Sequence, residues 1–331
     1  MTKAADVYVT RLLPEPALQI LREGGLSFRV WPDEGRPVPR DVLLQEVREC
    51  EGLLCLLTDR VDEELLAAAP RLRVVANTAV GLDNVDLAAC TRRGVMVTHT
   101  PGVLTETVAD LAWALLLAAA RRVVEAQKTI EAGGWNTWSL MFMTGQDVHG
   151  RTLGIVGAGR IGAAVARRAR GFQMRILYHN RRRNEALERE TGAEYRGFEE
   201  LLEEADFVVC LVPLTEETRG LFGYEQFRRM KRTAVFVNVA RGAVVREAEL
   251  ERALREGLIW AAGLDVFEKE PIGPDHPLLK LPNCVCLPHI GSATVATRLR
   301  MATLAAENLV AALAGRRPPN LANPEVLGPQ A

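Results

Sequence analysis

The chain has 331 residues, of which 48% are hydrophobic and 25% are charged, and its formal net charge is −1. This balance is typical of a globular protein, and the length suits two domains that each bury a core. A net charge so close to zero gives no electrostatic basis for binding nucleic acid or a membrane surface. We therefore expect neither partner.

Targeting signals and cysteines point to a cytoplasmic protein. Residues 1–6 show no basic stretch followed by an apolar run, which a signal peptide would need. The most apolar segment, 111–120, has roughly half the length of a membrane span and indicates a buried helix. The six cysteines include no Cys-x-x-Cys pair and no neighbouring His. We therefore expect reduced thiols in the core and no metal site.

The first hundred residues alternate short β-like runs with helical ones. Strands are predicted at 6–10, 28–31, 52–57, 74–76 and 95–98, with helices at 15–23, 40–50 and 63–69 between them. This alternation indicates a parallel sheet covered on both faces. A long helix over 104–132 and an aromatic-rich segment over 133–143 are predicted to follow.

A second β/α series begins at Thr152. Its predicted strands are 152–156, 175–179, 207–211, 234–238, 261–264 and 284–287. Six strands with intervening helices match a complete dinucleotide-binding sheet. The last long helix, 293–314, follows the completed series, so we expect it to fold back onto the N-terminal domain.

The first strand of this series runs into a Gly-x-Gly-x-x-Gly turn and then an amphipathic helix. The turn predicts a dinucleotide site: one glycine permits the tight turn, the next admits the pyrophosphate, and the last allows close helix packing. The helix N-terminus offers N–H donors and partial positive charge to the phosphates. The candidate residues are Gly157, Ala158, Gly159, Arg160, Ile161 and Gly162.

The end of the next strand bears on which nicotinamide cofactor is bound. An acidic residue there would bind the adenosine ribose and repel a 2′-phosphate. This chain instead has Asn180, Arg181 and Arg182, whose guanidinium groups can hold a phosphate. The loop favours NADP(H), with NAD(H) possible; a solvated basic loop is the plain alternative.

Three later motifs carry a family resemblance. They are Asn238-Val239-Ala240-Arg241-Gly242, the stretch from Gly263 to Pro271, and Leu287-Pro288-His289-Ile290-Gly291-Ser292-Ala293-Thr294. In their order and spacing the sequence resembles the D-isomer-specific 2-hydroxyacid dehydrogenases, over essentially the whole chain. Within the family it looks most like the glyoxylate/hydroxypyruvate reductase branch.

Three residues of these motifs suit the chemistry that the resemblance implies. Reduction of a 2-oxo acid adds hydride to C2 and a proton to the carbonyl oxygen. Arg241 can bind the substrate carboxylate and carbonyl oxygen, and His289 is the natural proton donor. Glu270 on the other ring nitrogen would favour the imidazolium. Glu268 is a rival to Glu270 that only the family's Glu-Pro pair sets aside.

The resemblance implies further site residues. Val80 and Gly81 are similar to a loop whose N–H groups meet the substrate carboxylate, although a plain turn would look the same. Trp138 is similar to an aromatic residue that reaches a partner subunit's active site, or else is simply interface core. Asp265 could instead cap a helix or pair with an Arg. Expected on the cofactor side are Thr107, Val239, Asp265 and Gly291.

The predicted fold is α/β, with two doubly wound parallel-sheet domains and a cleft between them. Residues 1–103 and 290–331 would form a flavodoxin-like substrate domain, and residues 104–289 a Rossmann cofactor domain. As in relatives, a homodimer is expected. The alternatives left open are a related dehydrogenase acting on 3-phosphoglycerate or D-lactate, and a dinucleotide-sensing corepressor.

Overall fold

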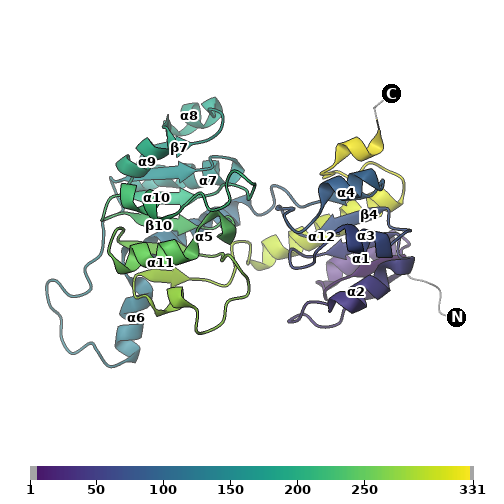
Figure 1. The fold of residues 1–331 in the computed structure, drawn as a ribbon, viewed down its shortest axis with the longest axis horizontal. Helices are drawn as coiled ribbons and strands as arrows, with labels where there is room; N and C mark the ends of the chain where they lie inside the picture. The colour runs from purple at the N-terminus through teal and green to yellow at the C-terminus, as the bar shows by residue number, and fades with distance from the viewer. Residues whose placement is uncertain (1–5, 329–331) are drawn as a thin grey trace. The chain divides into compact units, whose positions relative to one another are not determined.

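The computed structural model describes residues 6–328 and divides into two compact units (Figure 1). Unit one takes the described residues up to Leu104 together with those from Ala293 onward, and unit two runs from Thr105 to Ser292. Residues 1–5, which bear on the expectation of no signal peptide, lie outside the described residues. No helix within 6–328 is long and apolar enough to cross a membrane.

Unit one is built on a five-stranded parallel sheet. Its order is β2-β1-β3-β4-β5, the order of flavodoxin-like doubly wound sheets, so the predicted fold class is confirmed here. The strands are β1 (Val7–Val9), β2 (Phe28–Val30), β3 (Gly52–Cys55), β4 (Val74–Asn77) and β5 (Met96–Thr98).

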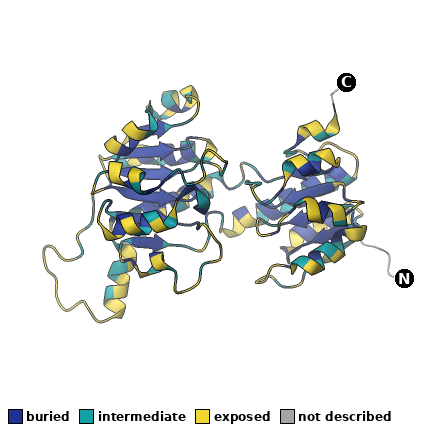
Figure 2. Ribbon diagram, viewed as in Figure 1, coloured by how far each residue is buried: buried dark blue, intermediate teal, exposed yellow. Residues whose placement is uncertain are grey.

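Alternate side chains of these strands enter two separate cores. Val7 and Val9 share one core with α1 (Glu15–Glu23) and α12 (Val295–Leu313), whereas Tyr8 shares the other with three shorter helices. The last helix therefore packs in the N-terminal unit, as expected from its place after the final strand. Burial on both faces explains why the inner strands β1 and β3 carry no charged residue, whereas the edge strand β2 includes the exposed Arg29 (Figure 2). The three shorter helices are α2 (Arg40–Glu46), α3 (Glu63–Ala68) and α4 (Leu87–Arg92).

Unit two contains a seven-stranded parallel sheet, one strand more than predicted. Its order, β8-β7-β6-β9-β10-β11-β12, is the 3-2-1-4-5-6 order of a dinucleotide-binding sheet extended by one strand. The unpredicted strand is β8, which is only two half-buried residues long and shows no apolar run. The strands are β6 (Thr152–Val156), β7 (Arg175–His179), β8 (Glu194–Tyr195), β9 (Phe207–Cys210), β10 (Val235–Asn238), β11 (Ala261–Leu264) and β12 (Cys284–Cys286).

The helices of unit two connect these strands and cover the sheet (Figure 1). The helix α5 packs on β10 and β11 and against α7. Core residues of α9 and α11 pack with strand residues in another cluster. The helices are α5 (Thr105–Ala120), α6 (Val123–Glu131), α7 (Arg160–Ala169), α8 (Glu185–Thr191), α9 (Phe198–Glu204), α10 (Tyr224–Arg229) and α11 (Glu247–Arg255).

The single helix predicted over 104–132 is wrong, because the structure has two helices there. The returning chain places the N–H of Gln146 on the carbonyl of Ala120, 2.9 Å away, and so ends α5. Arg122 then takes a left-handed backbone conformation with a φ of 56°. Its guanidinium pairs with Glu125 in the first turn of α6. The Gln146 contact comes from a residue far along the chain, which helical spacing does not report.

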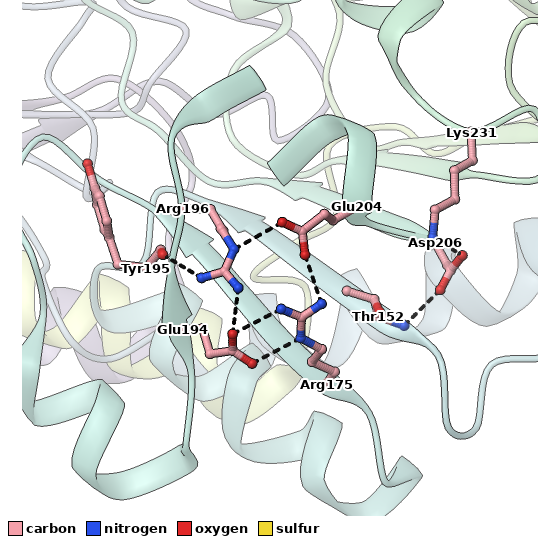
Figure 3. A network of polar contacts seen from close by, with 8 residues as sticks. All are labelled: Thr152, Arg175, Glu194, Tyr195, Arg196, Glu204, Asp206 and Lys231. Carbon is pink, nitrogen blue, oxygen red and sulfur yellow. Dashed lines mark hydrogen bonds and ion pairs between the residues drawn. The ribbon is translucent and has the colours of Figure 1, made fainter. Parts of the chain in front are cut away.

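The edge formed by β7 and β8 carries a ring of four charged side chains (Figure 3). Arg175 contacts Glu194 at 2.9 Å and Glu204 at 2.8 Å, and Arg196 contacts the same two carboxylates at 2.7 and 3.0 Å. The hydrogen bonds and charges of Arg175 and Arg196 lower the pKa of Glu194 from 4.5 to about 2. Slight burial of the carboxylate opposes this shift only in part. The ring thereby fixes the two-residue strand to its neighbour.

This ring predicts a pH-dependent contribution to stability. The folded-state pKa of Glu194 is lowered, so its contribution is complete above pH 4.5 and is lost as the pH falls toward about 2. We expect Glu194→Gln to lower the free energy of unfolding by about 0.5–1 kcal/mol at pH 7, because the ring is half-exposed. Urea denaturation from pH 7 to pH 2 should show this difference shrinking, and Glu185→Gln, in an exposed pair with Arg189, is the control. A pH-independent difference would contradict the assignment.

Candidate functional site

The glycine-rich turn joins β6 to α7 with the geometry of a phosphate-binding turn. Gly157 has a φ of +100°, and a Cβ there would lie 2.7 Å from the backbone of Leu211, so only glycine fits. A Cβ at Gly162 would lie 2.6 Å from the carbonyl oxygen of Gly157. A Cβ at Gly159 would meet nothing within 4 Å, which leaves open space above the helix N-terminus. Ala158 is buried, and Arg160 and Ile161 begin the helix. The turn therefore fits a dinucleotide pyrophosphate.

The loop after β7 braces this turn and presents arginines beside it. The Asn180 side chain accepts from the N–H of Ala158 at 2.7 Å and donates to its carbonyl at 3.3 Å. Arg183 is paired with Glu188 at 2.8 Å. Arg181 and Arg182 are exposed, and no carboxylate of the described residues lies within ion-pair distance of either, although the charge of Arg181 contributes to lowering the pKa of Glu217. Two guanidinium groups are therefore left facing solvent next to the turn.

The ends of three neighbouring strands carry the candidate catalytic residues. Arg241 follows β10, Glu270 follows β11 and His289 follows β12, and these strands are adjacent and parallel. Nδ1 of His289 lies 2.7 Å from Oε2 of Glu270, with 29% of each side chain exposed. Asn238 donates to the carbonyl of Arg241 at 3.0 Å and so tethers its backbone. The structure brings the three residues to one edge of unit two.

The charge on Glu270 is stabilised by its surroundings. Burial disfavours the carboxylate, but the hydrogen bond and charge of His289, the N–H of Phe267 and the charge of Arg241 together hold the pKa of Glu270 below its usual value. The Phe267 N–H lies 2.9 Å from the other carboxylate oxygen. Glu270 is therefore ionised at neutral pH and presents a negative charge to the His289 ring.

Asp265 holds the turn that presents His289. Its two carboxylate oxygens accept from the N–H groups of Ile290 and Gly291, each at 2.7 Å, and the residue is 1% exposed. Burial raises the pKa of Asp265, which these backbone donors and the charge of His289 oppose. His289 itself has a φ of 54°, a conformation uncommon outside glycine and found at functional turns. Asp265 and Gly291 are thus hydrogen-bonded to each other. A contact of either residue with the cofactor stays a prediction.

Glu268 and Glu270 point to different partners. The Glu268 carboxylate accepts from the backbone N–H of Glu247 at 2.9 Å, at the start of α11, whereas Glu270 contacts His289.

Sequence reasoning missed the close contact at Gly242, where a Cβ would lie 1.8 Å from the carbonyl carbon of Phe267. The glycine directly after Arg241 was the available signal. The absence of a side chain at Gly242 lets the Phe267 backbone pack directly against the chain just after Arg241.

The remaining predicted residues lie elsewhere in the two units. Val80 and Gly81 belong to unit one, where His99 Nδ1 lies 3.0 Å from the Val80 carbonyl and Asn77 donates to Gly81 at 3.0 Å. Trp138 is 76% exposed and lies in the segment that follows α6. In unit two lie Thr107, in the first turn of α5, and Val239, which is buried directly after β10.

Metal ligands do not gather in the described part of the chain. Within residues 6–328 no group of three or more His, Cys, Asp or Glu side chains could hold a metal ion. All six cysteines are free, and five of them are buried. The site therefore consists of the glycine-rich turn, the arginine loop and the residues at the strand ends.

The cofactor unit matches a known family model. Residues 113–291 match the model described as D-isomer specific 2-hydroxyacid dehydrogenase, NAD binding domain. The chain is also 56% identical over 322 residues to a glyoxylate reductase from Korarchaeum cryptofilum, with 97% of this chain and 96% of that protein covered. Unit two is accordingly a nicotinamide dinucleotide-binding domain.

Solved structures agree with this match. The TT0316 protein from Thermus thermophilus is 49% identical, with a TM-score of 0.90 and coverage of 96% of this chain and 99% of that one. An NADPH-dependent glyoxylate/hydroxypyruvate reductase from Sinorhizobium meliloti, in complex with NADP and malonate, is 34% identical. Its TM-score is 0.82, and 96% of this chain and 97% of that chain are covered.

Proposed function

The chain belongs to the D-isomer-specific 2-hydroxyacid dehydrogenase family, and we propose that it is a glyoxylate/hydroxypyruvate reductase that uses NADP(H). The observation that carries the proposal is the 2.7 Å contact between His289 and Glu270, beside the charge of Arg241 in a dinucleotide-binding unit. The curated relatives named as glyoxylate reductases support the substrate, because they match nearly the whole chain at up to 56% identity.

The triad performs the proton side of the reaction. A bound reduced nicotinamide supplies the hydride that adds to C2 of the 2-oxo acid. Arg241 binds the substrate carboxylate and carbonyl oxygen through its fork of donors and orients C2. His289 donates the proton from Nε2 to the carbonyl oxygen, because Nδ1 is held by Glu270. The product is glycolate from glyoxylate and the D-2-hydroxy acid from hydroxypyruvate, and His289 regains its proton from solvent.

Two features support the preference for NADP(H). No carboxylate follows β7 at 180–183, and Arg181 and Arg182 are exposed beside the glycine-rich turn. A 2′-phosphate there would gain charge-assisted hydrogen bonds, whereas the ribose of NAD(H) would lack its usual acidic partner. The relative solved with NADP is consistent with such a site. Within the same proposal, Val80, Gly81 and Trp138 bind substrate, and Thr107, Val239, Asp265 and Gly291 line the cofactor.

A homodimer is the proposed assembly, in the cytoplasm as the free cysteines favour. Exposed apolar side chains gather on α6 and the segment after it, namely Val123, Ile130, Trp135, Trp138, Leu140 and Met141. A cavity of about 560 Å³ beside α6, lined in part by Leu254, Trp260 and Leu281, adds apolar surface. Exposed apolar side chains concentrated in one segment are typical of an association site.

Sedimentation velocity tests the assembly. We expect a dimer at micromolar concentration, and Ile130→Glu should shift it toward monomer because a charge would be buried in the interface. Glu185→Gln, on the exposed helix α8, should leave the dimer intact. A wild-type protein that sediments as a monomer at all concentrations would overturn the dimer.

Initial rates of cofactor oxidation test the substrate and the cofactor together. We expect the wild type to reduce glyoxylate and hydroxypyruvate faster than pyruvate, and to prefer NADPH to NADH. Removing both guanidinium groups in Arg181→Ala/Arg182→Ala should cut kcat/KM for NADPH by roughly 10–100-fold, as loss of charge-assisted hydrogen bonds implies. The rate with NADH should change little. Arg189→Ala, in an exposed pair with Glu185, is the control.

Two results would count against this proposal. If no 2-oxo acid is turned over while the cofactor binds, the reductase is excluded. An equal loss with both cofactors in the double variant would mean that the arginines do not read the 2′-phosphate.

The pH dependence of E270Q tests the triad. Since the pKa of Glu270 is lowered, its carboxylate stays ionised at every pH above 4.5. Gln keeps an acceptor but no charge, so the imidazolium loses stabilisation. We expect kcat/KM to fall about 10–100-fold and its decline at alkaline pH to begin at a lower pH. Glu251→Gln, whose carboxylate pairs with Arg255, should keep the wild-type profile. An unshifted profile in E270Q would exclude an electrostatic role for Glu270.

A further inference from the structure

A second histidine–carboxylate pair lies near the first and has no part in the proton transfer. Nε2 of His276 lies 3.3 Å from Oε2 of Glu247, and these side chains are only 20% and 15% exposed. Glu247 is the first residue of α11, and His276 directly precedes the 3-10 turn Pro277–Lys280. The pair therefore joins the start of a helix to the far end of the loop that carries Glu270.

The other oxygen of Glu247 reaches the near end of the same loop. Oε1 of Glu247 accepts from the backbone N–H of Glu268, while Oε1 of Glu268 accepts from the N–H of Glu247 at 2.9 Å. One carboxylate thus contacts both ends of the segment 268–276. Glu270 lies within this segment, two residues after the first contact.

The position of Glu247 is electrostatically unfavourable, which argues against an incidental contact. Burial raises the pKa of Glu247, and the negative charge of Glu268 raises it further. The hydrogen bond from the Glu268 N–H and the interaction with His276 lower the pKa, but by less. The helix N-terminus offsets part of the cost. The thiols of Cys284 and Cys286 on β12 are the other titratable groups that interact with Glu247. A carboxylate that is only 15% exposed thus contacts Glu268 and His276, the two ends of one loop.

The contacts of Glu247 lead on to the pair formed by His289 and Glu270. The His276 ring packs edge-on against Phe267, with ring centroids 5.6 Å apart, and Phe267 is 5% exposed. The backbone N–H of Phe267 donates to Glu270, whose other oxygen contacts His289. A shift of the clamped ends would therefore move Glu270 relative to the imidazole.

We propose that Glu247 is a positioning residue, which clamps both ends of segment 268–276 and so holds the Glu270 carboxylate on His289. The proposal rests on the proposed reductase activity. Glu247 acts through Glu270, so its loss lowers the rate of proton transfer and leaves substrate binding by Arg241 in place.

A double-mutant cycle with Glu247→Ala and Glu270→Gln tests this. We expect E247A to lower kcat about tenfold, to change KM for glyoxylate less than threefold, and to move the alkaline decline toward that of E270Q. In the E270Q background E247A should have almost no further effect, because the group it positions has lost its charge. NADPH binding, followed by fluorescence, should be unchanged in every variant. Glu251→Ala, one turn along the same helix, is the matched control.

The possible results distinguish a failure of the positioning role from a failure of the proposed reductase activity. A wild type without turnover would defeat the proposed function before any variant is compared. With an active wild type, independent effects of E247A and E270Q, or an unshifted pH profile, would overturn the positioning role. If urea denaturation shows that E247A is not folded, His276→Ala is the second variant, because it releases only one end of the segment 268–276. It should give a smaller shift in the same direction, and a wild-type profile there would also overturn the proposal.

Discussion

The register of three parallel strands is the constraint on which the site depends. Asn238 pairs with Leu264, and Leu264 with Cys286, so β10, β11 and β12 end at one level of the sheet. Short stretches then lead to Arg241, Glu270 and His289. A slip of one residue would send every side chain of the strand to the opposite face and shift these ends out of line. The apolar residues that bury both faces of the sheet therefore also fix the geometry of the triad.

Beyond the strand ends, buried polar side chains hold the backbone in place. Asn238 holds the carbonyl of Arg241, Asp265 holds the two N–H groups after His289, and Glu247 contacts both ends of the Glu270 loop. Asn238 and Asp265 direct these hydrogen bonds to main chain, and Glu247 contacts one backbone N–H and the His276 side chain; a buried main-chain polar group without a partner would be costly. Loops held in this way keep catalytic groups at a defined spacing without regular secondary structure.

Much of this arrangement follows from local sequence patterns. Alternating strands and helices, the glycine-rich turn and the position of Arg241 and His289 after strands are all visible within short windows. Other features depend on contacts between distant residues. The end of α5 at Ala120 requires Gln146, and the strand β8 requires its neighbour β7. The contacts of Asp265 lie 25 and 26 residues away, so the sequence left its partner open. Glu268 and Glu270 differ only in which way the folded loop directs them.

The brace between Asn180 and Ala158 links coenzyme choice to the shape of the phosphate turn. Asn180 uses an acceptor and a donor on the same residue of that turn. An aspartate at this position, the acid expected of NAD-specific relatives of the fold, would keep the acceptor and lose the donor. A substitution that alters coenzyme preference would therefore disturb the phosphate turn less at Arg181 and Arg182, whose side chains are exposed to solvent, than at the residue directly before them.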